Sequence, residues 1–138
     1  MLPITLPTTD TTAIEYSAAG YAGTIPTEFG LLTMVTEMSL KDNTLSGRIP
    51  TELGQLTEIS SDFFLSWNSL TSAIPTQLGQ LVQMSFGFDL GSNLLSLAIP
   101  TQLGQLDQMS SKFYLHVNSL SSTIPTQVLR ACMTGLGV

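Results

Sequence analysis

Residues 99–123 read IPTQLGQLDQMSSKFYLHVNSLSST, and residues 74–98 read IPTQLGQLVQMSFGFDLGSNLLSLA. The two stretches agree at 16 of 25 aligned positions. Agreement at a fixed offset marks an internal repeat, which must be identified before any other signal is interpreted. The dipeptide Ile-Pro carries the same period through the chain, beginning at residues 25, 49, 74, 99 and 124. The sequence therefore predicts a solenoid of stacked coils.

The composition indicates a folded, acidic chain with few charges. Only 10% of its 138 residues are charged and 43% are hydrophobic, which is far from the composition of disordered chains. Ten acidic residues outnumber four basic ones, so the net charge is −6. Nucleic acids and anionic membranes attract basic surfaces, and the sequence has no basic stripe, so we expect neither as a partner. No apolar run is long enough for a membrane span, and the N-terminus does not resemble a secretory signal.

The clearest repeat unit spans residues 32–54 and follows the pattern L-x-x-V-x-x-M-x-L-x-x-N-x-L-S-G-x-I-P-x-x-L-G. Matches to it divide the chain into an irregular segment 1–13, a repeat region 14–129 and an irregular tail 130–138. The repeat region holds about five coils. The first coil is degraded, because Ala19 occupies the place of the asparagine in the later units.

This unit resembles the plant-type leucine-rich repeat. The motifs IPTELG and IPTQLG are similar to those in the repeat arrays of plant receptor-like and algal proteins. The resemblance covers roughly residues 14–129. It implies an α/β-type repeat solenoid: a short right-handed horseshoe with one parallel strand per coil, an extended or 3₁₀ convex side and little α-helix. It also implies ligand recognition outside the cell, although the residues themselves assign no compartment. The later units depart from the pattern, since the position of Gly47 becomes Ser72, Leu97 and Ser122.

Apolar residues two positions apart, such as Phe63 and Leu65, predict a strand with one buried face in each coil. After each strand the backbone turns inward, and its buried amide and carbonyl groups need hydrogen-bond partners. An asparagine side chain can both donate and accept, so we predict a structural ladder of Asn43, Asn68, Asn93 and Asn118. Glycines four residues after each proline (Gly30, Gly54, Gly79 and Gly104) are expected to permit a tight turn on the convex side.

Catalytic and metal sites are not expected. His116 is the sole histidine, and the nearest candidates for a triad, Ser110, Ser111 and Asp107, occupy ordinary repeat positions. A single histidine among scattered carboxylates lacks the spacing of a metal site. Cys132 is the sole cysteine, so the chain can form no intramolecular disulfide. We therefore predict a non-enzymatic chain without a cofactor.

The outward positions of the strands differ from coil to coil while the rest of the lattice is kept. We interpret them as the concave, partner-binding surface of a protein- or peptide-binding module, and the resemblance implies a piece of a receptor-like or inhibitor protein. Drift on an unused surface would give the same pattern. The predicted contact residues are Glu37, Ser39, Lys41, Asp62, Phe64, Ser66, Trp67, Asp89, Ser92, Lys112, Tyr114 and His116.

A threonine column supports an alternative function. One threonine follows each Ile-Pro pair, at Thr27, Thr51, Thr76, Thr101 and Thr126. Regular threonines on a solenoid can match an ice lattice, which would make the chain a surface-adhering or ice-binding protein. The column is only one residue wide and is flanked by Glu or Gln, so a solvent-facing β-branched residue on an extended backbone explains it equally.

The ends of the array lead to a further expectation. Plant-type arrays usually carry cysteine-bearing caps, and neither terminus of this chain has one. Open strand edges and uncovered apolar residues would follow. We expect self-association through the ends, fraying of the terminal coils, or a longer parent protein of which this chain is a fragment.

Overall fold

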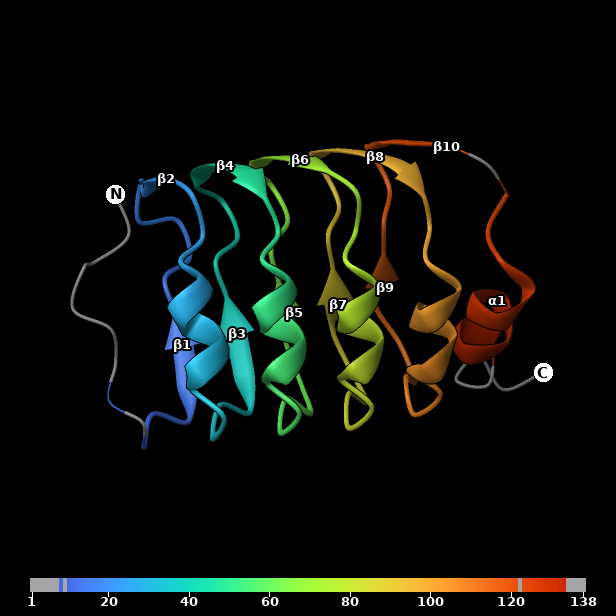
Figure 1. The fold of residues 1–138 in the computed structure, drawn as a ribbon, viewed down its shortest axis with the longest axis horizontal. Coiled ribbons are helices and arrows are strands. Elements are labelled where there is room, and N and C mark those ends of the chain that lie inside the picture. The colour runs from blue at the N-terminus through green and yellow to red at the C-terminus, as the bar shows by residue number, and fades with distance from the viewer. Residues whose placement is uncertain (1–7, 9, 122, 134–138) are drawn as a thin grey trace.

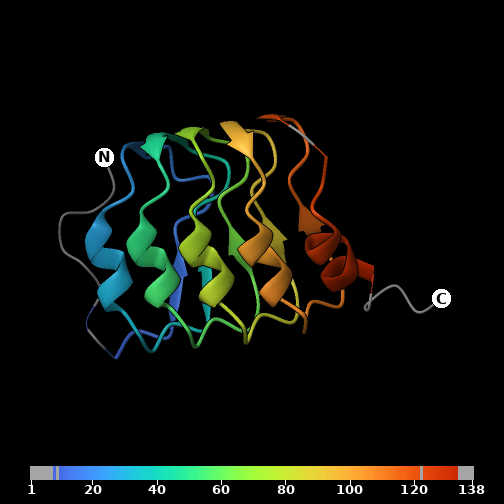
Figure 2. The same cartoon turned by 45° about the vertical axis from the view of Figure 1, so that its right-hand side comes forward.

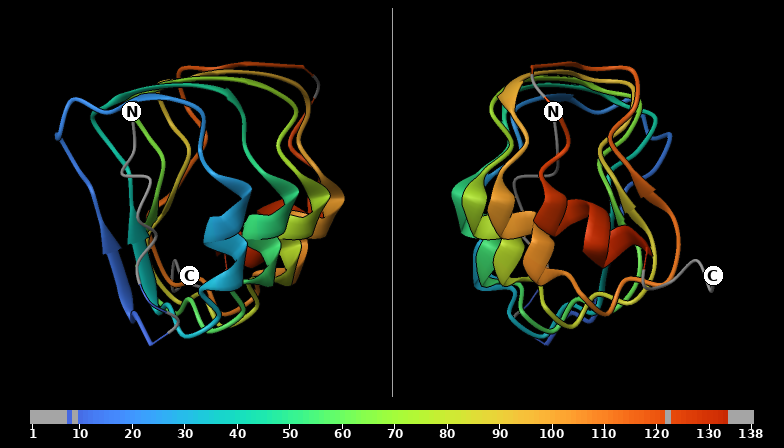
Figure 3. Two further views of the ribbon diagram at one scale, coloured as in Figure 1. Left: turned by 60° about the vertical axis from the view of Figure 1, so that its left-hand side comes forward. Right: turned by 90° about the vertical axis from the view of Figure 1, so that its right-hand side faces the viewer.

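The computed structural model describes residues 8, 10–121 and 123–133, and these form five coils stacked along one axis (Figure 1). The coils follow one another in chain order along the stack, from β1 at one end to α1 at the other. Each coil runs through a strand of a first sheet, then a strand of a second sheet, then a short helix (Figure 3). The predicted repeat solenoid is therefore confirmed. Residues 1–7, Thr9, Ser122 and the tail 134–138, for which irregular structure or a lattice position was predicted, lie outside the described residues.

The first sheet is the one that the apolar alternation predicts. It is parallel throughout, in the order β1 (Ala13–Glu15), β3 (Glu37–Ser39), β5 (Phe63–Phe64), β7 (Phe88–Asp89) and β9 (Phe113–Tyr114). Met38 pairs with Phe63, and Phe63 pairs with Phe88, so the register offset equals the 25-residue period of the sequence. The inward rings of Phe63, Phe88 and Phe113 stack with centroid separations of 5.6 and 5.1 Å.

A second parallel sheet was not predicted, because the expected fold has one strand per coil. Its strands run in the order β10 (Ser119–Ser121), β8 (Leu94–Ala98), β6 (Ser69–Ser72), β4 (Thr44–Arg48) and β2 (Ala22–Gly23). The strands are short; β4, β6 and β8 each bury a single leucine (Leu45, Leu70 and Leu95), and β2 and β10 bury no residue fully, so the sequence shows no alternation that could reveal this sheet. This sheet runs along the upper edge of the stack in Figure 1.

The third side consists of the 3₁₀ helices η1 (Thr27–Leu31), η2 (Thr51–Gln55), η3 (Thr76–Gln80) and η4 (Thr101–Gln105), as predicted (Figure 2). The role expected for their glycines is wrong. None of these four has a positive φ; instead, a Cβ on Gly54 would lie 2.5 Å from the carbonyl oxygen of Gln77 in the next coil. The glycines are needed because neighbouring coils approach closely, and not because the backbone turns.

An α-helix replaces the 3₁₀ turn in the last coil. Helix α1 spans Thr126–Met133, so residues 130–133, which were predicted to be irregular, are helical. The segment TQVLRACM contains Leu, Arg, Ala and Met, which favour helix, and it lacks the glycine of the earlier turns. Val128 packs inward and is buried, and it continues the column of Leu53, Leu78 and Leu103.

The four asparagines lie between successive coils and make equivalent hydrogen bonds. The Asn93 side chain donates to the carbonyls of Leu65, Leu90 and Gly91 at 3.0–3.3 Å, and its Oδ1 accepts from the Leu70 amide at 3.0 Å. One side chain thus satisfies groups of its own coil and of the coil before it. Because Asn93 is 6% exposed, water cannot replace these bonds.

Candidate partner-binding face

The solvent-facing side of the first sheet, here called the strand face, carries the predicted contact residues. Sheet register places Ser39, Phe64, Asp89 and Tyr114 side by side in one row across β3, β5, β7 and β9. Strands lie roughly 4.8 Å apart, so Phe64 and Tyr114 are separated by about 10 Å with Asp89 between them. These side chains therefore form one row across the strands.

Aromatic side chains contribute exposed apolar surface to this face. Trp67 is 63% exposed and Tyr114 is 44% exposed, whereas Phe64 is half-buried beneath the Lys41 ammonium, 5.6 Å from the ring centroid. Trp67 has a φ of 55°, a left-handed conformation shared by the equivalent residues Ala18, Asp42, Ser92 and Val117. This turn after each strand leaves the side chain exposed at the edge of the strand face.

Asp89, Tyr114 and His116 form one cluster toward the C-terminal end. The rings of Tyr114 and His116 meet edge to face at 5.5 Å, and Asp89 accepts a hydrogen bond from the Gly91 amide at 2.8 Å. A Cβ on Gly91 would lie 2.9 Å from His116 Cε1, so this glycine makes room for the imidazole. The cluster offers a partner a carboxylate, a phenol and an imidazole.

Carboxylates gather at the N-terminal end of the strand face. Burial raises the pKa of Glu15, and the charges of Glu37 and Asp62 raise it further, while Lys41 acts in the opposite direction. At the other end Lys112 places its ammonium 4.4 Å from the Phe86 ring centroid. The face is therefore acidic across β1–β5 and basic at β9. Sequence reasoning missed Glu15, although its pairing with Ser39 follows from the repeat alignment.

Two of the predicted contact residues are buried in the structure. Ser39 and Ser66 are each only 2% exposed, and the Ser39 hydroxyl is hydrogen-bonded to Ser17 at 2.6 Å. Ser39 is the register partner of Phe64, and a small side chain beside a large one is covered by it. Neither serine can contact a partner. The other polar candidates remain at least partly exposed: Glu37, Lys41, Asp62, Asp89, Ser92, Lys112 and His116.

Ser110, one of the residues weighed for a triad with His116, has a hydrogen-bond partner in another coil. The Ser110 hydroxyl donates to the Ser85 carbonyl at 2.8 Å, so it is engaged with the preceding coil. Within residues 8, 10–121 and 123–133, no three or more His, Cys, Asp or Glu side chains are grouped so that they could hold a metal ion. No helix in the same part of the chain is long and apolar enough to cross a membrane.

No family model matches the sequence, and no curated protein matches it. Several solved structures are similar to this chain. The leucine-rich-repeat ectodomain of the receptor kinase GASSHO1/SCHENGEN3 from Arabidopsis thaliana, in complex with CASPARIAN STRIP INTEGRITY FACTOR 2, has a TM-score of 0.74 and 31% identity; the match covers 80% of this chain and 13% of that one. The BIR3–SERK2 complex of the same plant has a TM-score of 0.72 and 32% identity. The match covers 84% of this chain and 61% of that one.

A plant ice-binding protein is also similar, with a TM-score of 0.72 and 28% identity over 80% of this chain and 35% of that one. This chain thus spans less than two thirds of each of these structures. The likenesses agree with the repeat pattern and with the observed strands and 3₁₀ turns. The chain is a leucine-rich repeat protein of the plant type.

Proposed function

We propose that this chain binds a protein or peptide segment on its strand face, without catalysis. The observation that carries the proposal is the row formed by Phe64, Asp89 and Tyr114, with the largely exposed Trp67 at its edge. Trp and Tyr dominate the energetics of interfaces because they bury a large area at a low cost in side-chain entropy. A row of unlike, accessible side chains on a rigid sheet is suited to recognition of one sequence.

The charges of the face suggest the orientation of the partner. A segment lying across the strands would contact Glu37 and Asp62 at one end and Lys112 at the other. A partner with a basic residue at the first end and an acidic residue at the second would match both, and a reversed partner would place like charges together. Two of the similar structures are complexes, one with CASPARIAN STRIP INTEGRITY FACTOR 2 and one of BIR3 with SERK2, which supports a protein or peptide ligand.

The test uses three variants of the immobilised chain: Trp67→Ala, Tyr114→Ala and the control Leu94→Ala. Leu94 is 58% exposed on the second sheet, away from the strand face. A partner captured by the wild-type chain is expected to lose about 1 kcal/mol or more of binding free energy with each aromatic variant, and none with Leu94→Ala. Equal affinity for all four proteins would exclude the strand face as the binding site.

Ice binding is the second candidate, and the threonine column is the observation that favours it. All five threonines are exposed, one per coil. Four of the hydroxyls, from Thr27 to Thr101, lie 3.2–3.4 Å from the side chain of the following Glu or Gln. Thermal hysteresis of the purified chain, lost on Thr76→Val or Thr76→Leu, would support this function; its absence would leave the column as a structural feature.

A further inference from the structure

One carboxylate in the central row of the strand face is held in place by the backbone. Asp89 is partly exposed, and its Oδ1 accepts a hydrogen bond from the Gly91 amide at 2.8 Å. Among the described residues this is the single hydrogen bond to the Asp89 carboxylate. The Gly91 amide therefore fixes the orientation of the carboxylate, and Oδ2 is left for a donor from outside the chain.

Both lysines of the strand face lie over aromatic rings. The Lys41 ammonium is 5.6 Å from the ring centroid of Phe64, and the Lys112 ammonium is 4.4 Å from the ring centroid of Phe86. Carboxylates outnumber these two ammonium groups on the face, at Glu15, Glu37, Asp62 and Asp89. A partner of complementary charge therefore brings positive charge to this face.

Tyr114 is the aromatic residue that a cation can reach beside Asp89. The two residues are register partners on neighbouring strands, so they lie about 4.8 Å apart along the row. Tyr114 is 44% exposed, and its ring is held edge to face against His116 with centroids 5.5 Å apart. Phe64, on the other side of Asp89, already carries the Lys41 ammonium. The Tyr114 ring is the open one of the two.

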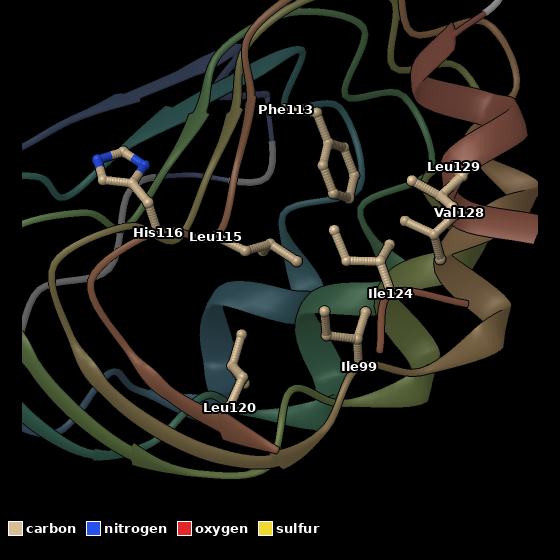
Figure 4. A pocket seen from close by; sticks show the side chains of 8 residues that line it. All are labelled: Ile99, Phe113, Leu115, His116, Leu120, Ile124, Val128 and Leu129. Atoms are coloured by element: carbon tan, nitrogen blue, oxygen red, sulfur yellow. The ribbon is translucent and has the colours of Figure 1, made fainter. Parts of the chain in front are cut away.

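His116 completes the group from the same strand as Tyr114. Figure 4 looks into the cavity at the end of the stack, and there the Leu115 side chain points toward the other labelled apolar residues while the His116 ring points away from them. A Cβ on Gly91 would lie 2.9 Å from His116 Cε1, 3.1 Å from His116 Nδ1 and 3.0 Å from Asp89 Oδ1. A glycine at position 91 thus lets the imidazole and the carboxylate lie together above the backbone.

The chemistry of these three side chains matches one kind of cation. A carboxylate, a phenol oxygen and a neutral imidazole nitrogen all accept hydrogen bonds. An arginine guanidinium carries five N–H donors and no acceptor, and its plane stacks on aromatic rings. A lysine ammonium is a point charge without a plane to stack. A carboxylate beside an open aromatic ring therefore suits a guanidinium, which bonds to the first and lies on the second.

We propose that Asp89 and Tyr114 bind an arginine side chain of the partner segment, with His116 positioning the Tyr114 ring. The inference rests on the proposed function, since it names the residue that the partner presents to the central row of the strand face. In the row of Glu15, Ser39, Phe64, Asp89 and Tyr114, Asp89 is the one carboxylate with an aromatic register neighbour. A single arginine site sets the register of the partner across the strands.

A nuclear magnetic resonance titration tests the site without a known partner. The probes are N-acetyl-arginine amide, N-acetyl-lysine amide and the neutral N-acetyl-glutamine amide, and the reporter is the Gly91 amide, which is bonded to Asp89. The arginine probe is expected to shift this amide resonance saturably, with a dissociation constant at least about threefold lower than that of the lysine probe. The glutamine probe is expected to leave the resonance in place.

Two variants and a control assign the effect to its residues. Asp89→Asn keeps an oxygen for the Gly91 amide but removes the charge, and it should weaken binding of the arginine probe about tenfold or more. Tyr114→Leu should weaken it about threefold, through loss of the ring. Asp107→Asn removes the same charge from an exposed turn and should have no effect. Melting curves establish that each variant is folded.

The outcomes separate this inference from the proposed function. A Gly91 resonance that stays in place with the arginine probe, or moves equally with the glutamine probe, would overturn the inference. Equal binding of the lysine probe, or an unchanged dissociation constant in Asp89→Asn, would overturn it as well. The proposed function fails on a different measurement, in which a captured partner loses no affinity with Trp67→Ala. A captured partner that is weakened by Trp67→Ala but not by Asp89→Asn would retain the proposed function and overturn the arginine site.

Discussion

The 3₁₀ side of the solenoid and the strand face are made by the same coils, yet their sequences behave in opposite ways. Successive 3₁₀ turns read TELGQ, TQLGQ and TQLGQ, whereas the central row of the strand face reads Ser39, Phe64, Asp89 and Tyr114. On the 3₁₀ side, burial requires the leucine of each turn, and the close approach of the next coil requires the glycine. On the strand face Phe64 and Asp89 are partly exposed and Tyr114 is exposed, so packing restricts these positions less. Repetition therefore marks packing, and its loss marks surface that is free to take up another role.

The largest expected effect contrasts a glycine from each side. In Gly79→Ala the new Cβ would meet the Gln102 backbone at 2.4 Å, so the coils must separate, and we expect a loss of about 3 kcal/mol. In Gly91→Ala the Cβ would meet the ring of His116 at 2.9 Å, and this exposed side chain can move aside. That variant should lose less than about 1 kcal/mol. Urea denaturation gives both values, and equal losses would show that the 3₁₀ side is no more tightly packed than the strand face.

The next effect concerns the asparagine ladder between the two sheets. Asn93→Ala leaves the Leu70 amide without its acceptor and removes one of the donors to each of three carbonyls. We expect a loss of about 2 kcal/mol, with a similar loss for Asn68→Ala. The exposed Ser69, which follows Asn68 in the chain, provides the control. Ser69→Ala should change stability by less than about 0.5 kcal/mol. Denaturation midpoints that shift equally in all three variants would refute the structural role of the ladder.

A smaller effect is expected at Leu97, where the sequence places a bulky residue on a left-handed backbone conformation that favours glycine. Leu97 has a φ of 69° and is 60% exposed, and the equivalent Gly47 has a φ of 78°. Leu97→Gly should stabilise the chain by about 0.5–1 kcal/mol, since relief of left-handed strain exceeds the entropic cost of glycine. Leu94, on the same strand and 58% exposed, has no such strain, so Leu94→Gly should lose about 1 kcal/mol. Melting temperatures that move in the same direction would contradict this account.

The smallest effect is the pH dependence at Glu15. Its pKa is raised from the ordinary 4.5, so the folded chain holds this proton more tightly than the unfolded chain. The resulting stabilisation is complete below about pH 4.5 and is lost as the pH rises through the raised pKa. Glu15→Gln should remove this dependence and be more stable at neutral pH by about 0.3 kcal/mol, because the group is exposed. Glu28→Gln is the control, and an equal pH profile for wild type and Glu15→Gln would exclude the carboxylate cluster as the cause.

Features that recur once per coil could be predicted from the sequence, because recurrence reveals a shared physical constraint. The strand at Phe63, the asparagine at residue 68 and the turn after Pro75 are of this kind. Features that occur once could not. Ser39 is buried in a sheet beside Phe64, its register partner 25 residues away, and helix α1 forms where the repeat pattern has already ended. The second sheet was missed for a different reason: none of its strands buries more than one residue, and one apolar residue has no period.

The central claim is that lattice positions hold the fold while the strand face is free for a partner, and Leu65 and Trp67 test it two residues apart. Leu65 is 0% exposed and Trp67 is 63% exposed. In urea denaturation, Leu65→Ala is expected to lose about 3 kcal/mol, because it leaves a cavity between coils. Trp67→Ala should stay within about 0.5 kcal/mol of the wild-type chain. A loss in Trp67→Ala comparable to that in Leu65→Ala would show that the indole is a packing residue and would contradict the claim.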